Sequence, residues 1–129
     1  MERWPEETIP ILRVADADAS VQWYGRLGFR EEWRHRFEAG FPAFVSVRRG
    51  DDGPGVRLFL SEHRGDAVPG GSVYLRVEDV APIASEFDAD VHDAVSRLEV
   101  HLTDPDGNRL DIGARTGRRA EGYTYPADG

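Results

Sequence analysis

The chain has 129 residues, 40% of them hydrophobic, and it carries a formal net charge of −8 at pH 7 with no cysteine. These values predict a single domain with its own core, and they exclude disulfides, thiolate metal sites and cysteine nucleophiles. The acidic balance argues against nucleic-acid binding, and no apolar run approaches the roughly 18 residues of a membrane span.

Composition narrows the chemistry further. All 16 basic residues are arginine, which excludes Schiff-base chemistry through lysine. The N-terminal segment MERWPEETIP has neither the basic nor the apolar region of a signal peptide, so we expect a cytoplasmic protein without a membrane partner.

The first half of the chain predicts a strand, a helix and then a β-rich segment. Residues 9–14 form the strand, and Asp16 is placed to cap a helix that ends at Gly28. That helix presents three apolar residues on one face: Val21, Tyr24 and Leu27. The segment AFVSVRRGDDGPGVRLFLS then predicts a hairpin with Asp52-Gly53 in its turn.

The second half repeats this order. LRVAD at residues 12–16 returns as LRVED at residues 75–79. Residues 72–77 predict a strand, Asp79 a cap, and Ile83 with Phe87 the apolar face of a shorter helix. RLEVHLTDPDGNRLDIG predicts a second hairpin that turns at Asp106-Gly107.

Each half therefore predicts strand, helix, strand, strand, strand. We expect a single domain over residues 1–129, with a first module at 8–66, a second module at 67–114 and a flexible tail at 115–129. The second module is shorter, and DADVHDAV leaves little room for a full helix and second strand.

Alternation within the strands predicts two different sheet faces, because successive side chains point to opposite sides. One face is aliphatic and suited to packing under helices: Leu12, Val14, Val45, Val47, Leu58 and Leu60, then Val73, Leu75, Val77, Leu98, Val100, Leu102, Leu110 and Ile112. The other mixes aromatic and charged residues: Ile9, Ile11, Arg13, Trp33, His35, Phe37, Phe44, Ser46, Arg57 and Phe59, then Ser72, Tyr74, Arg76, Glu99, His101, Arg109 and Asp111. This mixed face suits a ligand cleft; the alternative is a solvated face.

The paired LRVAD and LRVED segments, WYGRLGF at residues 23–29 and TDPDGNRLDI at residues 103–112 resemble the vicinal oxygen chelate superfamily. This superfamily includes glyoxalase I, extradiol dioxygenases and bleomycin-resistance proteins, and RLFLSEHRGD is most similar to the bleomycin-resistance branch. The resemblance implies an α+β fold of two βαβββ modules that form a curved mixed sheet around a cleft. It also implies a homodimer.

Metal-dependent members of this superfamily place their ligands at equivalent points of the two modules. Aligning Leu12 with Leu75 and Leu58 with Leu110 puts four residues at those points: Ile9, Phe59, Ser72 and Asp111. A divalent catalytic metal needs about three His, Asp or Glu ligands. We therefore expect neither a metal nor another cofactor.

An aromatic cleft without a catalytic centre is typical of a binding protein. Trp33, Phe37, Phe44 and Phe59 could stack on a flat heteroaromatic group, and Glu99 and Asp111 could pair with a cation. The predicted ligand-binding residues are Trp33, His35, Phe37, Phe44, Phe59, Tyr74, Glu99, His101 and Asp111. Together with the resemblance, they predict a non-enzymatic resistance protein that sequesters a planar, cationic antibiotic of the bleomycin type.

Two observations keep other functions open. Arg13, Arg57, Arg76 and Arg109 fall on the mixed face and could neutralise the two carboxylates. The resistance proteins also often carry a Pro-Trp-Gly element where this chain has DAVSR. The alternatives are a lyase or isomerase of the same fold, with a degenerate metal site or with His101 and Asp111 as an acid/base pair, and a scaffold that binds no ligand.

Overall fold

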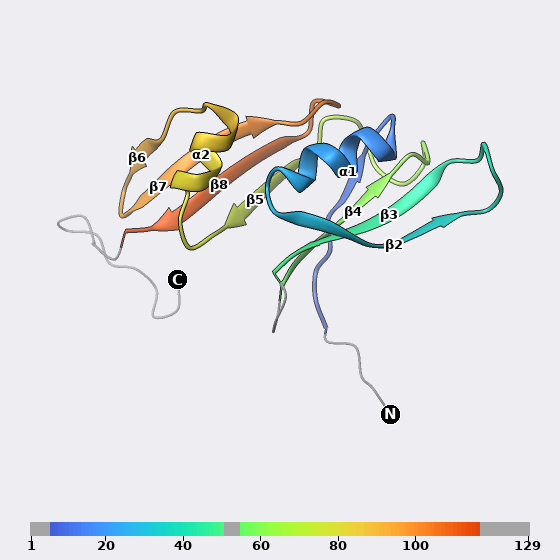
Figure 1. The fold of residues 1–129 in the computed structure, drawn as a ribbon, viewed down its shortest axis with the longest axis horizontal. Coiled ribbons are helices and arrows are strands. Elements are labelled where there is room, and N and C mark those ends of the chain that lie inside the picture. The colour runs from blue at the N-terminus through green and yellow to red at the C-terminus, as the bar shows by residue number, and fades with distance from the viewer. Residues whose placement is uncertain (1–5, 51–54, 117–129) are drawn as a thin grey trace. The chain divides into compact units, whose positions relative to one another are not determined.

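The computed structural model describes residues 6–50 and 55–116, which form two βαβββ modules. The first contains β1 (Ile11–Arg13), α1 (Ala17–Gly25), β2 (Phe29–Arg36), β3 (Ala43–Arg49) and β4 (Val56–Ser61). The second contains β5 (Ser72–Arg76), α2 (Ala81–Phe87), β6 (His92–Ala94), β7 (Arg97–Thr103) and β8 (Arg109–Arg115). The predicted α+β class and the two modules are confirmed, and each module has its own four-stranded mixed sheet (Figure 1).

The chain divides into two compact units that match these modules, except that one turn of the second module belongs to the first unit. The first unit runs to Gly71 and also includes Pro105–Asn108, the turn between β7 and β8; the second comprises Ser72–Asp104 and the chain from Arg109. The expectation of a single domain remains a prediction.

In the first unit the strand order is β1-β4-β3-β2, with β1 parallel to β4 and the other pairs antiparallel. Helix α1 packs against β2, β3 and β4, as Figure 1 shows. The six predicted aliphatic residues of this unit, from Leu12 to Leu60, are at most 2% exposed. Tyr24 of α1 is also fully buried, as predicted for the apolar face of the helix, whereas Val21 is only half-buried. The predicted helix end at Gly28 is wrong: α1 ends at Gly25, and the buried Leu27 follows it in the turn before β2.

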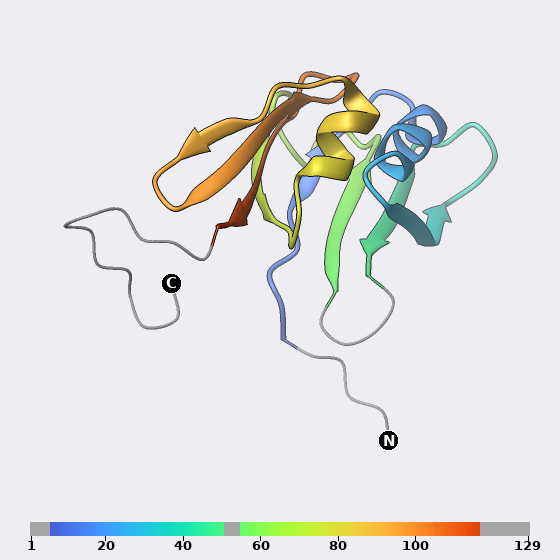
Figure 2. The ribbon, with the colours of Figure 1, turned by 60° about the vertical axis from the view of Figure 1, so that its left-hand side comes forward.

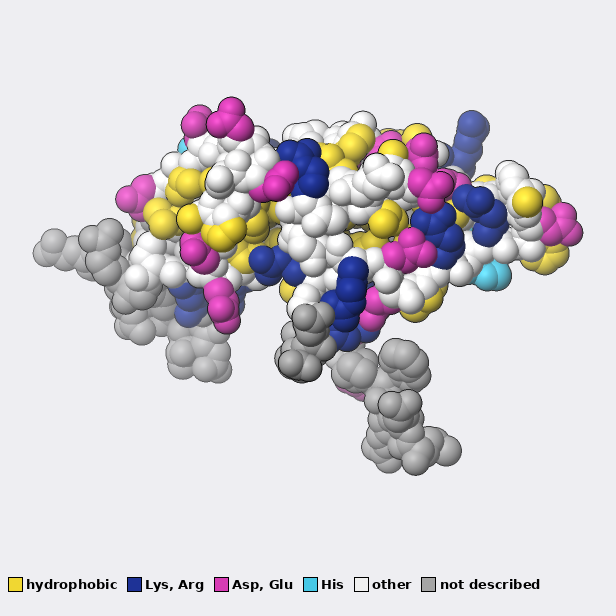
Figure 3. Space-filling model, viewed as in Figure 1, with side chains coloured by type: hydrophobic (Ala, Val, Ile, Leu, Met, Phe, Trp, Pro, Cys, Tyr) yellow, Lys and Arg dark blue, Asp and Glu magenta, His cyan; other side chains and the backbone are white. Residues whose placement is uncertain are grey.

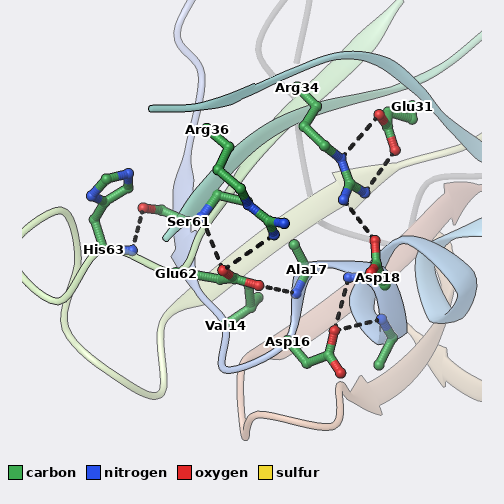
Figure 4. A network of polar contacts seen from close by, with 12 residues as sticks. Val14, Asp16, Ala17, Asp18, Glu31, Arg34, Arg36, Ser61, Glu62 and His63 are labelled. Carbon is green, nitrogen blue, oxygen red and sulfur yellow. Dashed lines mark hydrogen bonds and ion pairs between the residues drawn. The ribbon is translucent and has the colours of Figure 1, made fainter. Parts of the chain in front are cut away.

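Two carboxylates fix the start of α1 (Figure 4). Asp16 is the N-cap residue, as predicted, and accepts hydrogen bonds from the backbone N–H groups of Asp18 and Ala19. The two oxygens of Glu62, just after β4, accept from Ala17 N–H at 2.7 Å and from Ala43 N–H at 2.9 Å. Glu62 therefore ties the first turn of the helix to the first residue of β3.

The turn at residues 105–108 also contributes bonds to the first unit. Asp106 accepts from Ala15 N–H at 2.9 Å. The buried Asn108 side chain accepts from Gly71 N–H at 2.8 Å and donates to the Arg13 carbonyl at 2.9 Å. Gly107 occupies the predicted turn with φ of 85°, a conformation that favours glycine. The sequence predicts Asp106 only as a turn residue, but its carboxylate also binds the backbone between β1 and α1 through Ala15.

The second unit has the strand order β5-β8-β7-β6, with β5 parallel to β8 (Figure 2). Its helix has seven residues and β6 only three, in line with the limited room predicted there. The predicted cap at Asp79 is wrong by one position. Val80 is the N-cap residue and provides no side-chain hydrogen bond, while Asp79 accepts from Ala81 N–H at 2.9 Å.

The predicted Asp52-Gly53 turn lies outside the described residues, as does the predicted tail from residue 117 onward. Strand β8 extends to Arg115. Within residues 6–50 and 55–116, no helix is long and apolar enough to cross a membrane.

Candidate functional site

The mixed faces of the two sheets carry different side-chain chemistry at equivalent strand positions. In the first unit, Trp33, Ser46, Phe59 and Ile11 are partners across β2, β3, β4 and β1. In the second, His101, Asp111 and Tyr74 are partners across β7, β8 and β5. Phe59 thus corresponds to Asp111, as predicted from the repeat, and Ser46 corresponds to His101.

Three of the predicted aromatic residues meet on the first sheet and form what we call the aromatic cluster: Trp33, Phe44 and Phe59. Trp33 stacks on Phe44 with an interplanar angle of 12° and a centroid distance of 6.0 Å. Phe59 lies 5.5 Å from Trp33 and 5.0 Å from Phe44. Trp33 remains 44% exposed, so the cluster presents an aromatic surface to solvent.

A small residue allows this arrangement. Trp33 and Phe59 stand on strands that flank β3, and Ser46 is the residue of β3 between them. Strands two apart are separated by about 9.5 Å, so two rings can touch only if the residue between them is short. Ser46 is fully buried beneath the contact.

The other two predicted residues of this sheet lie at its margin. His35 pairs with Phe44 in the strand register and so belongs to the same face. Phe37 follows the end of β2; its ring lies 5.5 Å from that of Phe41 and its side chain is 73% exposed. Thus Phe37 belongs to a second aromatic pair at the β2–β3 turn.

Glu32 is a residue of this face that the sequence did not predict. The register of β2 against β3 shifts between Glu31 and Trp33, which leaves Glu32 as the extra residue of a β-bulge. Its carboxylate accepts hydrogen bonds from Ser46 Oγ at 3.0 Å and from Arg57 Nε at 2.6 Å and Nη2 at 3.2 Å. Strict alternation places Glu32 on the helix side, and the bulge brings it beside Trp33.

The charges next to the aromatic cluster are paired with one another. The hydrogen bond from Arg57 holds the pKa of Glu32 below its ordinary value, and Glu32 in turn raises the pKa of Arg57. Arg57 also bonds Glu7, and Arg48 Nη1 lies 4.0 Å from Glu32. Figure 3 shows arginine and acidic side chains similarly adjacent on the face in view. The aromatic cluster therefore has balanced charge beside it.

The second sheet carries a polar cluster of four predicted site residues: Tyr74, Glu99, His101 and Asp111. His101 Nδ1 lies 2.6 Å from Asp111 Oδ1, and Arg109 Nε donates to the same oxygen at 3.1 Å. The hydrogen bond from His101, supported by Arg109, holds the pKa of Asp111 below its ordinary value. Asp111 is thus a paired, ionised acceptor that orients the imidazole.

Glu99 is paired as well. Arg97 Nε lies 2.9 Å from Glu99 Oε2, Tyr74 Oη donates to that oxygen at 3.4 Å, and His101 Nε2 lies 3.8 Å from Oε1. The Tyr74 hydroxyl fits because residue 113 is glycine: a Cβ there would lie 2.1 Å from Tyr74 Oη. Arg109 neutralises Asp111, one of the outcomes the sequence left open; the partner of Glu99, Arg97, was not predicted.

A family model described as "Glyoxalase superfamily protein" matches residues 2–116. The chain belongs to the glyoxalase superfamily. The vicinal oxygen chelate resemblance seen in the sequence is thereby confirmed. Among curated proteins, no sequence matches the chain.

Solved structures share the glyoxalase-superfamily fold at low identity. A bleomycin-binding protein in complex with bleomycin is 23% identical, with a TM-score of 0.61 over 86% of this chain and 99% of that one. A bleomycin resistance determinant encoded on the transposon Tn5 is 23% identical, with a TM-score of 0.62 over 86% and 98%. A glyoxylase/bleomycin resistance protein/dioxygenase domain from Frankia sp. EAN1pec is 17% identical, with a TM-score of 0.63 over 88% and 99%.

The residues at the superfamily's metal positions do not fit a metal. Strand register confirms that Phe59 and Asp111 are equivalent, and Phe59, like Ile9, offers no ligand atom. The one carboxylate, Asp111, is bonded to His101 and Arg109. Across residues 6–50 and 55–116, no group of three or more His, Asp or Glu side chains is placed to hold a metal ion.

Proposed function

We propose that this glyoxalase-superfamily protein binds a small molecule without a metal, sequesters it and so keeps it from its target. The observation that carries the proposal is the aromatic cluster, in which three rings in mutual contact leave Trp33 44% exposed. A planar heteroaromatic group can stack there, and each aromatic pair contributes about 0.5–1.5 kcal/mol beyond the buried area. An antibiotic of the bleomycin type is the candidate ligand, because two structural relatives are a bleomycin-binding protein and a bleomycin resistance determinant.

Attraction of a cationic ligand is assigned to the whole chain rather than to a single carboxylate. Glu32, Glu99 and Asp111 already have arginine partners. The net charge of −8 supplies a long-range field that speeds the approach of a cation. A cytoplasmic location, which the sequence leads us to expect, and a homodimer, which the family resemblance implies, belong to the same proposal.

The test is calorimetric titration of the protein with metal-free bleomycin. Trp33→Ala and Phe59→Ala each remove a stacking partner, so each is expected to weaken binding roughly two- to tenfold. Phe41→Ala is the control, because its ring lies against Phe37 outside the cluster and Phe41 is not a predicted ligand-binding residue; it should leave the affinity unchanged. Equal losses for all three variants, or no binding by the unmodified protein at high drug concentration, would refute the proposal.

A second candidate, an enzyme of the same fold, is favoured by the 2.6 Å contact between His101 and Asp111. An imidazole held by a carboxylate at Nδ1 leaves Nε2 as a general base. Mass spectrometry of ligand recovered after long incubation separates the two. Sequestration returns the ligand unchanged, whereas an enzyme gives a product that is lost in His101→Ala.

A further inference from the structure

We infer that Glu32 is a positioning residue for the aromatic cluster: its carboxylate locks the β2 bulge to β3 and β4 and so holds the Trp33 ring against Phe59. The effect on the ring is a property of the folded chain. The effect on ligand affinity rests on the function proposed above.

The bulge itself makes such a lock necessary. A strand with an extra residue can lose the bulge by slipping one position, and a one-residue slip moves each side chain to the opposite face. If Glu32 took the place opposite Ser46, Trp33 would pair with Val45 and point to the helix side. The position of Trp33 therefore depends on what holds Glu32 in the bulge.

The hydrogen bonds of Glu32 reach the two strands on which the other two rings stand. Ser46 belongs to β3 with Phe44, and Arg57 belongs to β4 with Phe59. Ser46 also separates Trp33 from Phe59 in the register. One carboxylate at the residue before Trp33 thus fixes β2 to both neighbours of its ring.

The lock is held in turn by its own partners. Arg57 binds Glu32 through two nitrogens and Glu7 through a third, so the guanidinium is restrained from two sides. Trp33, by contrast, is 44% exposed, and its indole is held by contacts with the rings of Phe44 and Phe59. An anchor at Glu32 adds directional restraint that ring contacts lack.

The test uses the free protein labelled with 5-fluorotryptophan and observed by fluorine NMR. The chain has three tryptophans, and Trp33→Phe assigns the resonance of Trp33. Glu32→Ala is expected to shift and broaden that resonance, and Glu32→Gln to do so less, because the amide oxygen can still accept from Ser46. If Glu32→Ala does not fold, Ser46→Ala removes the hydrogen bond from Ser46 Oγ to Glu32 and should likewise shift and broaden the Trp33 resonance.

Glu31→Gln is the matched control. It makes the same chemical change one residue away, and the partner of Glu31 is Arg34, which bonds Asp18 of α1. This variant should leave the Trp33 resonance in place. An unmoved Trp33 resonance in folded Glu32→Ala and Ser46→Ala proteins, or an equal shift in Glu31→Gln, would overturn the assignment of Glu32.

A second measurement addresses the ligand. The dissociation constant for metal-free bleomycin is expected to rise about two- to threefold in Glu32→Ala, less than in Trp33→Ala, and to stay unchanged in Glu31→Gln. A shifted resonance with unchanged affinity would overturn the role of Glu32 in recognition. Absence of binding by the unmodified protein would refute the proposed function instead, while the fluorine spectra still decide whether Glu32 positions the ring.

Discussion

Two small residues, Ser46 and Gly113, determine which large side chains meet on the mixed faces of the two sheets. Ser46 lets Trp33 and Phe59 touch across β3. Gly113 leaves room for the Tyr74 hydroxyl, which reaches Glu99 over the backbone of β8. In both places a missing or short side chain on the middle strand brings together groups from the strands beside it.

Gly113→Ala is expected to displace Tyr74. The new Cβ would lie 2.1 Å from Tyr74 Oη, closer than any real contact, and the half-exposed tyrosine would have to swing into solvent. We expect a loss of about 1 kcal/mol in the free energy of unfolding. Urea unfolding of Gly113→Ala, Tyr74→Ala and the double variant measures it. The cost of the alanine should vanish in the Tyr74→Ala background, and a cost that persists there would show that Tyr74 is not its cause.

Glu32 is expected to make stability depend on acid pH. Its folded-state pKa is below its unfolded value because Arg57 donates to the carboxylate. The pairing therefore stabilises the protein above the ordinary value of 4.5, and this contribution is lost as pH falls through the folded-state pKa. Urea unfolding between pH 7 and acid pH should show a smaller loss for Glu32→Gln than for the unmodified chain. Asp111, with its lowered pKa, leaves part of the dependence in place. Identical pH profiles would mean that the pair adds no stability.

At the scale of elements, Glu62 connects three segments of the first unit. It follows β4 and accepts from the first residue of α1 and the first residue of β3 (Figure 4). Ala17 and Ala43 are fully buried, so their N–H groups have no water to replace the carboxylate.

Glu62→Ala should destabilise the protein by about 1–3 kcal/mol for each N–H group left unpaired, less whatever relaxation recovers. Thermal unfolding followed by circular dichroism measures the change. Glu38→Ala is the control, because Glu38 is an exposed residue in the turn between β2 and β3. Equal melting temperatures for the two variants would contradict a structural role for Glu62.

The helix starts illustrate how far local sequence predicts an element. Asp16 precedes α1 and caps it, as the sequence predicts. Asp79 occupies the equivalent place before α2, yet Val80 is the N-cap residue and Pro82 lies in the first turn. Proline suits a first turn because it needs no N–H partner there, and it moves the start of α2 one residue beyond the aspartate.

At the scale of the whole molecule, the same order of strands and helix occurs twice, and the two sheets present surfaces of different chemistry. Equivalent strand positions hold Phe59 and Asp111, and Ser46 and His101. The first surface exposes aromatic rings, and the second carries the hydrogen-bonded cluster of Tyr74, Glu99, His101 and Asp111. The two modules therefore share a strand register and differ in the chemistry of the side chains at these positions.

The net charge gives a prediction for the kinetics of binding. If the electric field of the net charge of −8 steers a cationic ligand to the protein, salt should screen that attraction. The association rate constant should then fall several-fold between low and high salt, while the dissociation rate constant changes little. Stopped-flow tryptophan fluorescence with metal-free bleomycin measures both. A salt effect confined to dissociation would indicate that direct ion pairs, rather than long-range attraction, hold the ligand.

The sequence by itself determined the two modules, the sheet faces and the equivalence of Phe59 with Asp111. These depend on alternation and repetition along the chain, which are local and can be read directly. It also placed Trp33, Phe44 and Phe59 on one face. The three-dimensional structure alone decided that their rings meet over Ser46 and that Phe37 stands apart with Phe41.

The bulge at Glu32 and the arginine partners of Glu32 and Glu99 also emerged only from the tertiary structure. Each depends on which residues of neighbouring strands come to lie opposite one another. One extra residue in a strand changes that pairing without changing its composition or hydrophobic pattern, so charge balance beside the rings could not be read from the chain alone.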